Sequence, residues 1–168
     1  LDLSFMALEL DKGEVIIPDY TFTSSALAPM LSGLDIRFCD VEYRTANIDP
    51  KLIEHCINEK TKAIVSVDYA GHPCQIDRIL EIARKHSLTV VHDAAQSCGS
   101  KYKGEYAGTQ AKVSCFSFHA TKNLSTGEGG CLVTNDDELA ERAYVLRDKG
   151  TNKHSFIDQK DLGYYEYQ

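Results

Sequence analysis

Three polar clusters directly follow apolar runs that are typical of buried strands. Asp68 and Tyr69 follow AIVSV, the segment HDAAQS with Asp93 follows TVV, and the segment SFHATKN with Lys122 follows VSCF. In open α/β sheets, ligands bind at the carboxyl ends of strands. A carboxylate and an amine at neighbouring strand ends are costly to shelter from water unless a ligand uses both charges. The pattern therefore predicts a site for a ligand with a cationic nitrogen and a carbonyl group.

Pyridoxal phosphate is a ligand of that kind. It requires a lysine amine for a Schiff base, a carboxylate on the ring nitrogen, phosphate donors and usually a flat side chain on the ring face. By residue type, these roles can be filled by Lys122, Asp93, Ser117 and Phe22. Plainer interpretations stay open at this point, because Asp93 could serve as a turn or helix-capping residue and Lys122 as a solvated loop lysine.

The elements that would position these residues are short apolar runs that alternate with helical patterns. The runs predict strands at 15–17, 36–39, 63–67, 89–92, 113–118 and 131–134. Most are continuously apolar, which is typical of a parallel sheet buried on both faces. The polar stretch TKNLSTGEGG has no helical period, so the strands around it either form a hairpin or flank a functional loop. The predicted fold class is α/β, with a mixed, mostly parallel sheet sandwiched by helices.

Helices are predicted between the strands. Apolar spacing indicates helices over 75–86 and 136–149, the second with acidic residues in its first turn and a glycine just beyond its end. Asp49 and Pro50 suit the N-cap and first position of another helix. Pro29 interrupts the helical pattern of 22–32, where we expect a kink or a late start.

The composition is that of an acidic globular protein. The chain has 168 residues, with 18 lysines and arginines against 25 acidic residues and a net charge of −7. This balance argues against a nucleic-acid or anionic-membrane binder, because both need basic surface. No stretch approaches the roughly 18 apolar residues of a membrane span, and the start LDLSFMALELD is acidic where a signal peptide is basic. We therefore expect a cytoplasmic protein without nucleic-acid or membrane partners.

The cysteines are scattered along the chain without CxxC or another close metal-binding spacing. We interpret them as buried thiols, and expect neither disulfides nor a metal site. There are six: Cys39, Cys56, Cys74, Cys98, Cys115 and Cys131.

Five strings, in order, resemble the motifs of the DegT/DnrJ/EryC1/StrS family of pyridoxal-phosphate-dependent sugar aminotransferases: VIIPDYTFTSSA, VDYAGHPCQID, VVHDAAQSCGSKYKG, CFSFHATKNLSTGEGG and RDKGTN. The resemblance runs from Gly13 to Asn152. It implies the large domain of the type I, aspartate aminotransferase-like fold, with residues 1–150 as its central part and 151–168 as the start of a connection toward a C-terminal small domain. The HATKN, GEGG and KGTN sequences look closest to the transaminases that make dTDP-4-amino-4,6-dideoxygalactose.

The resemblance implies roles for particular residues. Lys122 would form the Schiff base and move the proton between the amino donor and the cofactor, and Asp93 would pair with the ring nitrogen. Gln96 would lie beside the 3-hydroxyl group of the ring, and Ser117 would donate to the phosphate. Lys122 and Asp93 are thus the expected catalytic residues, and no metal is expected.

Two further residues are implied as part of the cofactor pocket. Phe22 would stack on the ring and His119 would line the same pocket, with core packing as the rival interpretation of both. The sequence also departs from the family pattern. Asp68 stands where many members have histidine, so a carboxylate would replace an imidazole, and nothing in LDLSFMALEL matches the family's glycine- and threonine-rich phosphate segment.

The implied reaction transfers the amino group of glutamate to a keto carbon of a nucleotide-linked deoxysugar, with dTDP-4-keto-6-deoxyglucose as the expected substrate. The expected setting is a homodimer in polysaccharide or lipopolysaccharide biosynthesis. One alternative is a sugar dehydratase with the same cofactor, whose members carry histidine in place of Lys122. Another is a non-catalytic regulatory or binding homologue, against which the intact Lys122 and Asp93 argue. A plain nucleotide-binding domain is disfavoured because neither GxGxxG nor GxxxxGK[ST] occurs.

Overall fold

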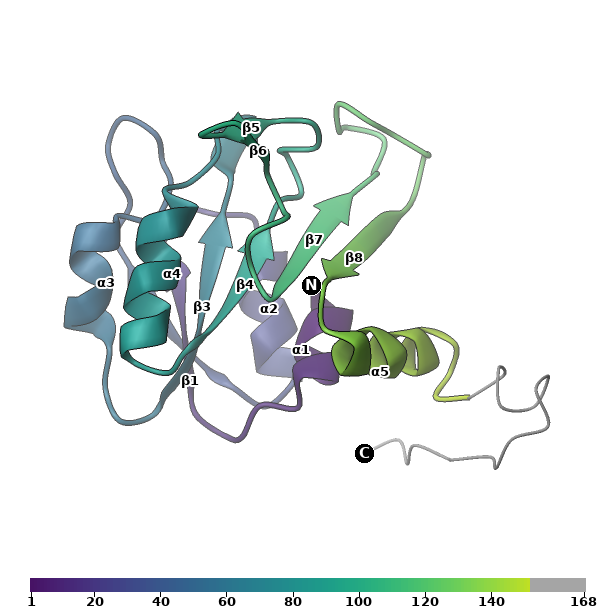
Figure 1. The fold of residues 1–168 in the computed structure, drawn as a ribbon, viewed down its shortest axis with the longest axis horizontal. Coiled ribbons are helices and arrows are strands. Elements are labelled where there is room, and N and C mark those ends of the chain that lie inside the picture. Colours follow the sequence, from purple (N-terminus) through teal and green to yellow (C-terminus); the bar gives the residue numbers. More distant parts are fainter. Residues whose placement is uncertain (152–168) are drawn as a thin grey trace.

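Six strands form one sheet in the order β2-β1-β3-β4-β7-β8 in the computed structural model, which describes residues 1–151. The strands are β1 (Glu14–Pro18), β2 (Asp35–Cys39), β3 (Thr61–Val67), β4 (Thr89–Asp93), β7 (Val113–Ser117) and β8 (Gly130–Thr134). All neighbouring pairs are parallel except β7 and β8, which are antiparallel (Figure 1). The mixed, mostly parallel sheet is confirmed, with strand ends within two residues of the predicted ones.

Helices cover both faces of this sheet (Figure 1). Helices α1 (Asp2–Leu8), α2 (Ser24–Leu31) and α5 (Asp137–Arg147) pack on one face, and α3 (Pro50–Cys56) and α4 (Ile76–Lys85) pack on the other. Each face has its own buried cluster. One contains Phe5, Val15, Ala28, Val65, Val91, Leu139 and Ala143, and the other contains Ile16, Ile53, Ile64, Ile79, Ala83 and Val90.

Strand β4 shows how this arrangement separates two polar residues. Successive side chains of a strand point to opposite faces of the sheet. Val91 belongs to the core under α1, α2 and α5, whereas Val90 belongs to the core under α3 and α4. By the same alternation, Asp93 faces the α2 layer and His92 faces the α4 layer. The two neighbours in sequence therefore enter different polar networks.

The predicted helix starts are confirmed at two positions. Asp49 caps α3, where its side chain accepts the N–H of Lys51 at 2.9 Å, and Pro50 is the first helical residue. Asp136 caps α5 and accepts the N–H of Leu139 at 3.0 Å. Helix α5 ends at Arg147, two residues before the predicted end.

Helix α2 differs from the expectation of a late start at its proline. It begins at Ser24 and includes Pro29 in its second turn. A proline here lacks the N–H that would bond the carbonyl of Ser25, and the helix ends two residues later at Leu31. The proline therefore precedes the end of the helix instead of marking its start.

Some elements have no counterpart in the sequence-based prediction. They are α1, the two-residue strands β5 (Lys101–Tyr102) and β6 (Glu105–Tyr106), which pair with each other, and a 3₁₀ turn at Tyr69–Gly71. Helix α1 has seven residues, or about two turns, which is too short to show a clear apolar period. Strands of two residues likewise show no alternation.

All six cysteines are free thiols, as expected. Cys39, Cys74 and Cys115 are buried, whereas Cys56 and Cys98 are half-buried and Cys131 is exposed. The expectation of buried thiols was therefore wrong for Cys131. The reason is that β8 is the outer strand of the described sheet, with β7 on one side only.

The predicted connection at 151–168, apart from Thr151, lies outside the described residues, as does Asn152 of the KGTN motif. Within residues 1–151, no helix combines the length and the apolar character needed to cross a membrane. The described part of the chain thus consists of one sheet, a small hairpin and the helices that cover the sheet.

Candidate functional site

A cavity of about 640 Å³ lies at the carboxyl ends of β1, β3, β4 and β7. Strand β1 is adjacent to both β2 and β3, so the chain order changes direction here, and such switch points are where open α/β sheets bind ligands. The structure brings all the predicted site residues into the lining of this cavity: Lys122, Asp93, Gln96, Ser117, Phe22 and His119.

Asp93 is the last residue of β4 and is 5% exposed. Its Oδ2 accepts the hydroxyl of Ser25 at 2.9 Å, and its Oδ1 accepts the N–H of Ala95 at 3.2 Å. Burial raises the pKa of Asp93 above its ordinary value, and these two donors oppose that effect. Within the described residues the carboxylate has no ion-pair partner, so a cationic group in the cavity would be its natural counterpart.

Lys122 lies in the segment between β7 and β8 and lines the cavity. Its backbone N–H donates to the carbonyl of His119 at 2.9 Å, which closes a tight turn. The side chain is half-buried, and its amine forms neither a hydrogen bond nor an ion pair with residues 1–151. The amine is therefore available to a ligand.

Gln96 is held by the 3₁₀ turn that follows β3. Its Oε1 accepts the N–H of Ala70 at 2.6 Å, an arrangement that leaves the side-chain NH₂ group as a donor for the cavity. Gly71, the last residue of this turn, has φ of +79°, and a Cβ there would lie 2.8 Å from the carbonyl oxygen of Gln96. The turn thus needs glycine in order to approach Gln96 closely.

Ser117 and His119 form the wall that leads to the lysine. The Ser117 hydroxyl accepts the N–H of His119 in a long contact of 3.4 Å and also faces the cavity. Nδ1 of His119 lies 3.0 Å from Oγ1 of Thr121, and its Nε2 lies 3.8 Å from the carboxylate of Glu128. His119 is exposed, so core packing does not explain it.

Phe22, like His119, is exposed to solvent. It is 73% exposed although it is a large apolar side chain, and it lines the cavity from the loop between β1 and α2. Core packing is therefore wrong for Phe22 as well. An exposed aromatic face beside a polar cavity is suited to contact with a flat ligand.

Asp68, which stands where the family pattern has histidine, is among the residues that line the cavity. It is fully buried, and its Oδ1 lies 2.9 Å from Nε2 of His92 and accepts the N–H of Cys74 at 2.9 Å. Burial alone would raise the pKa of Asp68, but the hydrogen bond and charge of His92 lower it below its ordinary value. The carboxylate thus forms a buried pair with His92 at the wall of the cavity.

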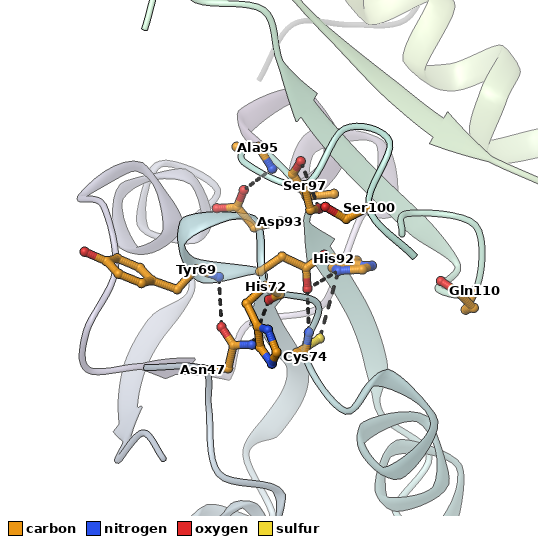
Figure 2. A network of polar contacts seen from close by, with 12 residues as sticks. Asn47, Tyr69, His72, Cys74, His92, Asp93, Ala95, Ser97, Ser100 and Gln110 are labelled. Carbon is orange, nitrogen blue, oxygen red and sulfur yellow. Dashed lines mark hydrogen bonds and ion pairs between the residues drawn. The ribbon is translucent and has the colours of Figure 1, made fainter. Parts of the chain in front are cut away.

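Figure 2 shows the separation of the two networks: the Asp93 carboxylate turns toward Ala95, whereas His92 lies beside Cys74. Ligand atoms of Asp68, Cys74 and His92 lie within 4.8 Å of one another, and by residue type such a group could bind a metal ion. The 2.9 Å contact between Asp68 and His92 is a direct hydrogen bond, however, and we describe the group as a polar cluster of the core.

Sequence reasoning missed two residues next to the site. Ser25 touches the carboxylate of Asp93, and Thr21 touches Ser25 with 2.8 Å between the two hydroxyl oxygens. Both lie in the string TFTSSA, but a serine near the start of a helix is usually a local capping residue. No local signal indicates a partner 68 positions away.

A protein-family model, that of the DegT/DnrJ/EryC1/StrS aminotransferase family, matches residues 1–165. An uncharacterized protein of Methanocaldococcus jannaschii is 42% identical over 100% of this chain and 44% of its own length. GDP-perosamine synthase of Escherichia coli O157:H7 is 39% identical over 98% of this chain and 45% of its own length.

The solved structure of Helicobacter pylori PseC, an aminotransferase involved in the biosynthesis of pseudoaminic acid, has a TM-score of 0.88 and 35% identity to this chain. The match covers 98% of this chain and 45% of that one. The chain therefore spans somewhat less than half the length of the relatives that it matches.

Proposed function

Because this chain belongs to the DegT/DnrJ/EryC1/StrS aminotransferase family, we propose that it forms the cofactor-binding part of a sugar aminotransferase. Aminotransferases of this family depend on pyridoxal phosphate. The observation that carries the proposal is the presence, in one cavity, of a buried carboxylate without a cationic partner and an amine without an anionic partner among residues 1–151. The carboxylate is that of Asp93, the last residue of β4. The amine is that of Lys122, in the segment that follows the neighbouring strand β7.

The residues of the cavity fit this cofactor. Asp93 would hold the ring nitrogen and Lys122 would make the covalent link. The free NH₂ group of Gln96 would donate to the ring hydroxyl, the Ser117 hydroxyl would donate to the phosphate, and the exposed face of Phe22 would cover the ring. An ionised Asp93 suits a protonated ring nitrogen, because the part of the chain that the structure describes offers this carboxylate no ion-pair partner.

When bound, pyridoxal phosphate supplies a ring that withdraws electrons from the bonds of the carbon next to the amino group. In this proposal, Asp93 keeps a proton on the ring nitrogen and so maintains that withdrawal. The Lys122 amine would serve as the base that takes a proton from Cα of the amino donor and as the acid that gives a proton back. Phe22 would cover one face of the ring, and Gln96 would bind its hydroxyl group.

The finer assignments are also part of the proposal. Glutamate is the proposed amino donor and dTDP-4-keto-6-deoxyglucose the proposed acceptor, in a cytoplasmic homodimer that serves polysaccharide biosynthesis. The named relatives support an amino transfer to a sugar in such biosynthesis, since one is a GDP-perosamine synthase and another acts in pseudoaminic acid formation. These names differ in the sugar, so the acceptor needs a direct assay.

The covalent link is the first experiment. Purified full-length protein is treated with pyridoxal phosphate and then borohydride, and the modified peptide is identified by mass spectrometry. We expect the label on Lys122, its loss in Lys122→Ala, and its retention in Lys51→Ala, which removes an exposed lysine on α3. A label on another lysine, or none in the unmodified protein, would contradict the proposal.

The substrate is the second experiment. The full-length protein is given glutamate and a panel of nucleotide-linked keto sugars, and 2-oxoglutarate and aminosugars are measured. We expect bleaching of the cofactor absorbance by glutamate and an amino product from the dTDP-linked 4-keto sugar. A labelled lysine with no response to glutamate would instead favour another amino donor or the non-catalytic alternative.

A further inference from the structure

A buried serine that is not among the lining residues of the cavity contacts the carboxylate of the site. Ser25, the second residue of α2, is fully buried, and its Oγ lies 2.9 Å from Oδ2 of Asp93. Its Oγ also lies 2.8 Å from Oγ1 of Thr21. Thr21 lines the cavity, so a chain of hydroxyl groups connects the cavity wall to the carboxylate.

The packing of α2 holds Ser25 in this place. Ala28, one turn further along, is part of the core under the same face of the sheet, together with Val91 of β4. Residues three apart share a helix face, and Val91 and Asp93 share a strand face. The helix face that packs on β4 therefore presents Ser25 to Asp93.

The direction of the hydrogen bonds depends on the charge of Asp93. An ionised carboxylate only accepts, so the Ser25 hydroxyl must donate to it. The Ser25 oxygen then accepts the hydroxyl of Thr21. A hydrogen bond to a charged carboxylate stabilises the ionised form, and Ser25 and the Ala95 N–H are the donors that counteract the rise in the pKa of Asp93 caused by burial.

We propose that Ser25 is a positioning residue for amino transfer, which keeps the Asp93 carboxylate ionised and oriented toward the ring nitrogen of the cofactor, with Thr21 orienting the Ser25 hydroxyl. This inference rests on the proposed function, because that function assigns the ring nitrogen to Asp93.

The first test uses the full-length protein without cofactor. Its aspartates are labelled with ¹³C, and the Asp93 carboxyl signal, assigned by its absence in Asp93→Asn, is titrated by NMR. In Ser25→Ala the midpoint of Asp93 is expected to rise by about one pH unit. In Ser25→Thr, which keeps the hydroxyl, it is expected to stay near that of the unmodified protein.

Ser114→Ala is the matched control. Ser114 is a fully buried serine of β7 whose hydroxyl has no hydrogen-bond partner among the described residues, so the same substitution there should leave the Asp93 midpoint unchanged. Should Ser25→Ala fail to fold, Thr21→Val removes the outer hydroxyl with little change in shape, and a smaller rise is expected. An unchanged midpoint in the folded variant would overturn the inference.

The second test uses the protein with its cofactor. In Ser25→Ala, kcat is expected to fall about tenfold, with KM for both substrates unchanged and the acidic limb of the kcat profile moved to higher pH. The borohydride-reducible link to Lys122 should remain. Absence of that link in the unmodified protein would refute the proposed function, whereas an intact link with an unaltered kcat and pH profile in Ser25→Ala would refute this inference alone.

Discussion

Nε2 of His92 lies 2.9 Å from Oδ1 of Asp68, and both side chains are buried on the face of the sheet that α4 covers. The same carboxylate accepts the N–H of Cys74 at the approach to α4. Asp68 thus joins the ends of β3 and β4 to the segment that leads into α4. Its main effect should be on stability, whereas Asp93, on the opposite face, serves the cavity.

Replacing Asp68 by alanine should destabilise the protein strongly. The change leaves the buried donors of His92 and Cys74 without an acceptor, at a cost of about 3–5 kcal/mol in the free energy of unfolding. Urea unfolding of cofactor-free protein measures this. The control is Asp77→Ala, which removes exposed contacts with Lys103 and Tyr102 and should cost about 1 kcal/mol or less. Similar losses in both variants would mean that the buried pair contributes no more to stability than the exposed contacts of Asp77.

Replacing Asp93 by asparagine should stabilise the cofactor-free protein at neutral pH while it abolishes amino transfer. Because burial raises the pKa of Asp93 in the folded state, the folded form holds its proton more tightly than the unfolded one. The resulting stability is present below the ordinary pKa of 3.8 and is lost as pH rises through the folded pKa.

The pH dependence provides the check on that prediction. The melting temperature of Asp93→Asn minus that of the unmodified protein should be larger at pH 7 than at pH 4, in cofactor-free samples. The asparagine can still bond Ser25 and Ala95, so loss of packing does not enter the comparison. A difference that shrinks toward pH 7 would mean that Asp93 is not destabilising when ionised.

A pair of glycine substitutions separates backbone strain from steric contact. Gly33 and Gly71 both have φ of +79°, but a Cβ at Gly33 would meet nothing within 4 Å, whereas one at Gly71 would lie 2.8 Å from the Gln96 carbonyl oxygen. Gly33→Ala should cost about 1–2 kcal/mol. Gly71→Ala should cost more and also weaken cofactor binding through Gln96. Urea unfolding and cofactor titration measure both effects, and equal losses in stability would show that the turn tolerates a side chain.

Two thiols should resist modification until the protein unfolds. Burial raises the pKa of Cys39 to about 12 and that of Cys74 well above its ordinary value. The thiolate is the reactive form, so both should remain unlabelled by a thiol reagent in native buffer and react fully in urea. Peptide mapping after timed labelling follows each cysteine, and fast native labelling of Cys74 would contradict its place beside His92.

The strands and the general location of the site could be predicted because both depend on local pattern. Apolar runs such as AIVSV and TVV formed β3 and β4, and the polar residues after them, among them Asp93, met at one edge of the sheet. The helix caps at Asp49 and Asp136 were likewise local.

The contacts that tune the site were not accessible in this way. Ser25 and Asp93 are 68 positions apart, and their contact exists only because α2 and β4 share a face of the sheet. The pairing of Asp68 with His92 depends on the parallel neighbours β3 and β4, whose register no sequence pattern specifies. The exposure of Cys131 similarly depends on which strand is outermost.

The neighbouring positions of β4 and β7 have a consequence for how this protein could be modified. Their hydrogen-bonded register, which pairs Asp93 with Cys115, sets the spacing between the Asp93 carboxylate and the segment that carries Lys122. The turns at the amino ends of β2, β3 and β4, at 32–34, 57–60 and 86–88, lie outside that register. Insertions in these turns, such as a short peptide tag at 86–88, should leave the distance between the Asp93 carboxylate and the Lys122 amine unchanged. These turns are therefore suitable positions for attaching a tag or for varying the sequence.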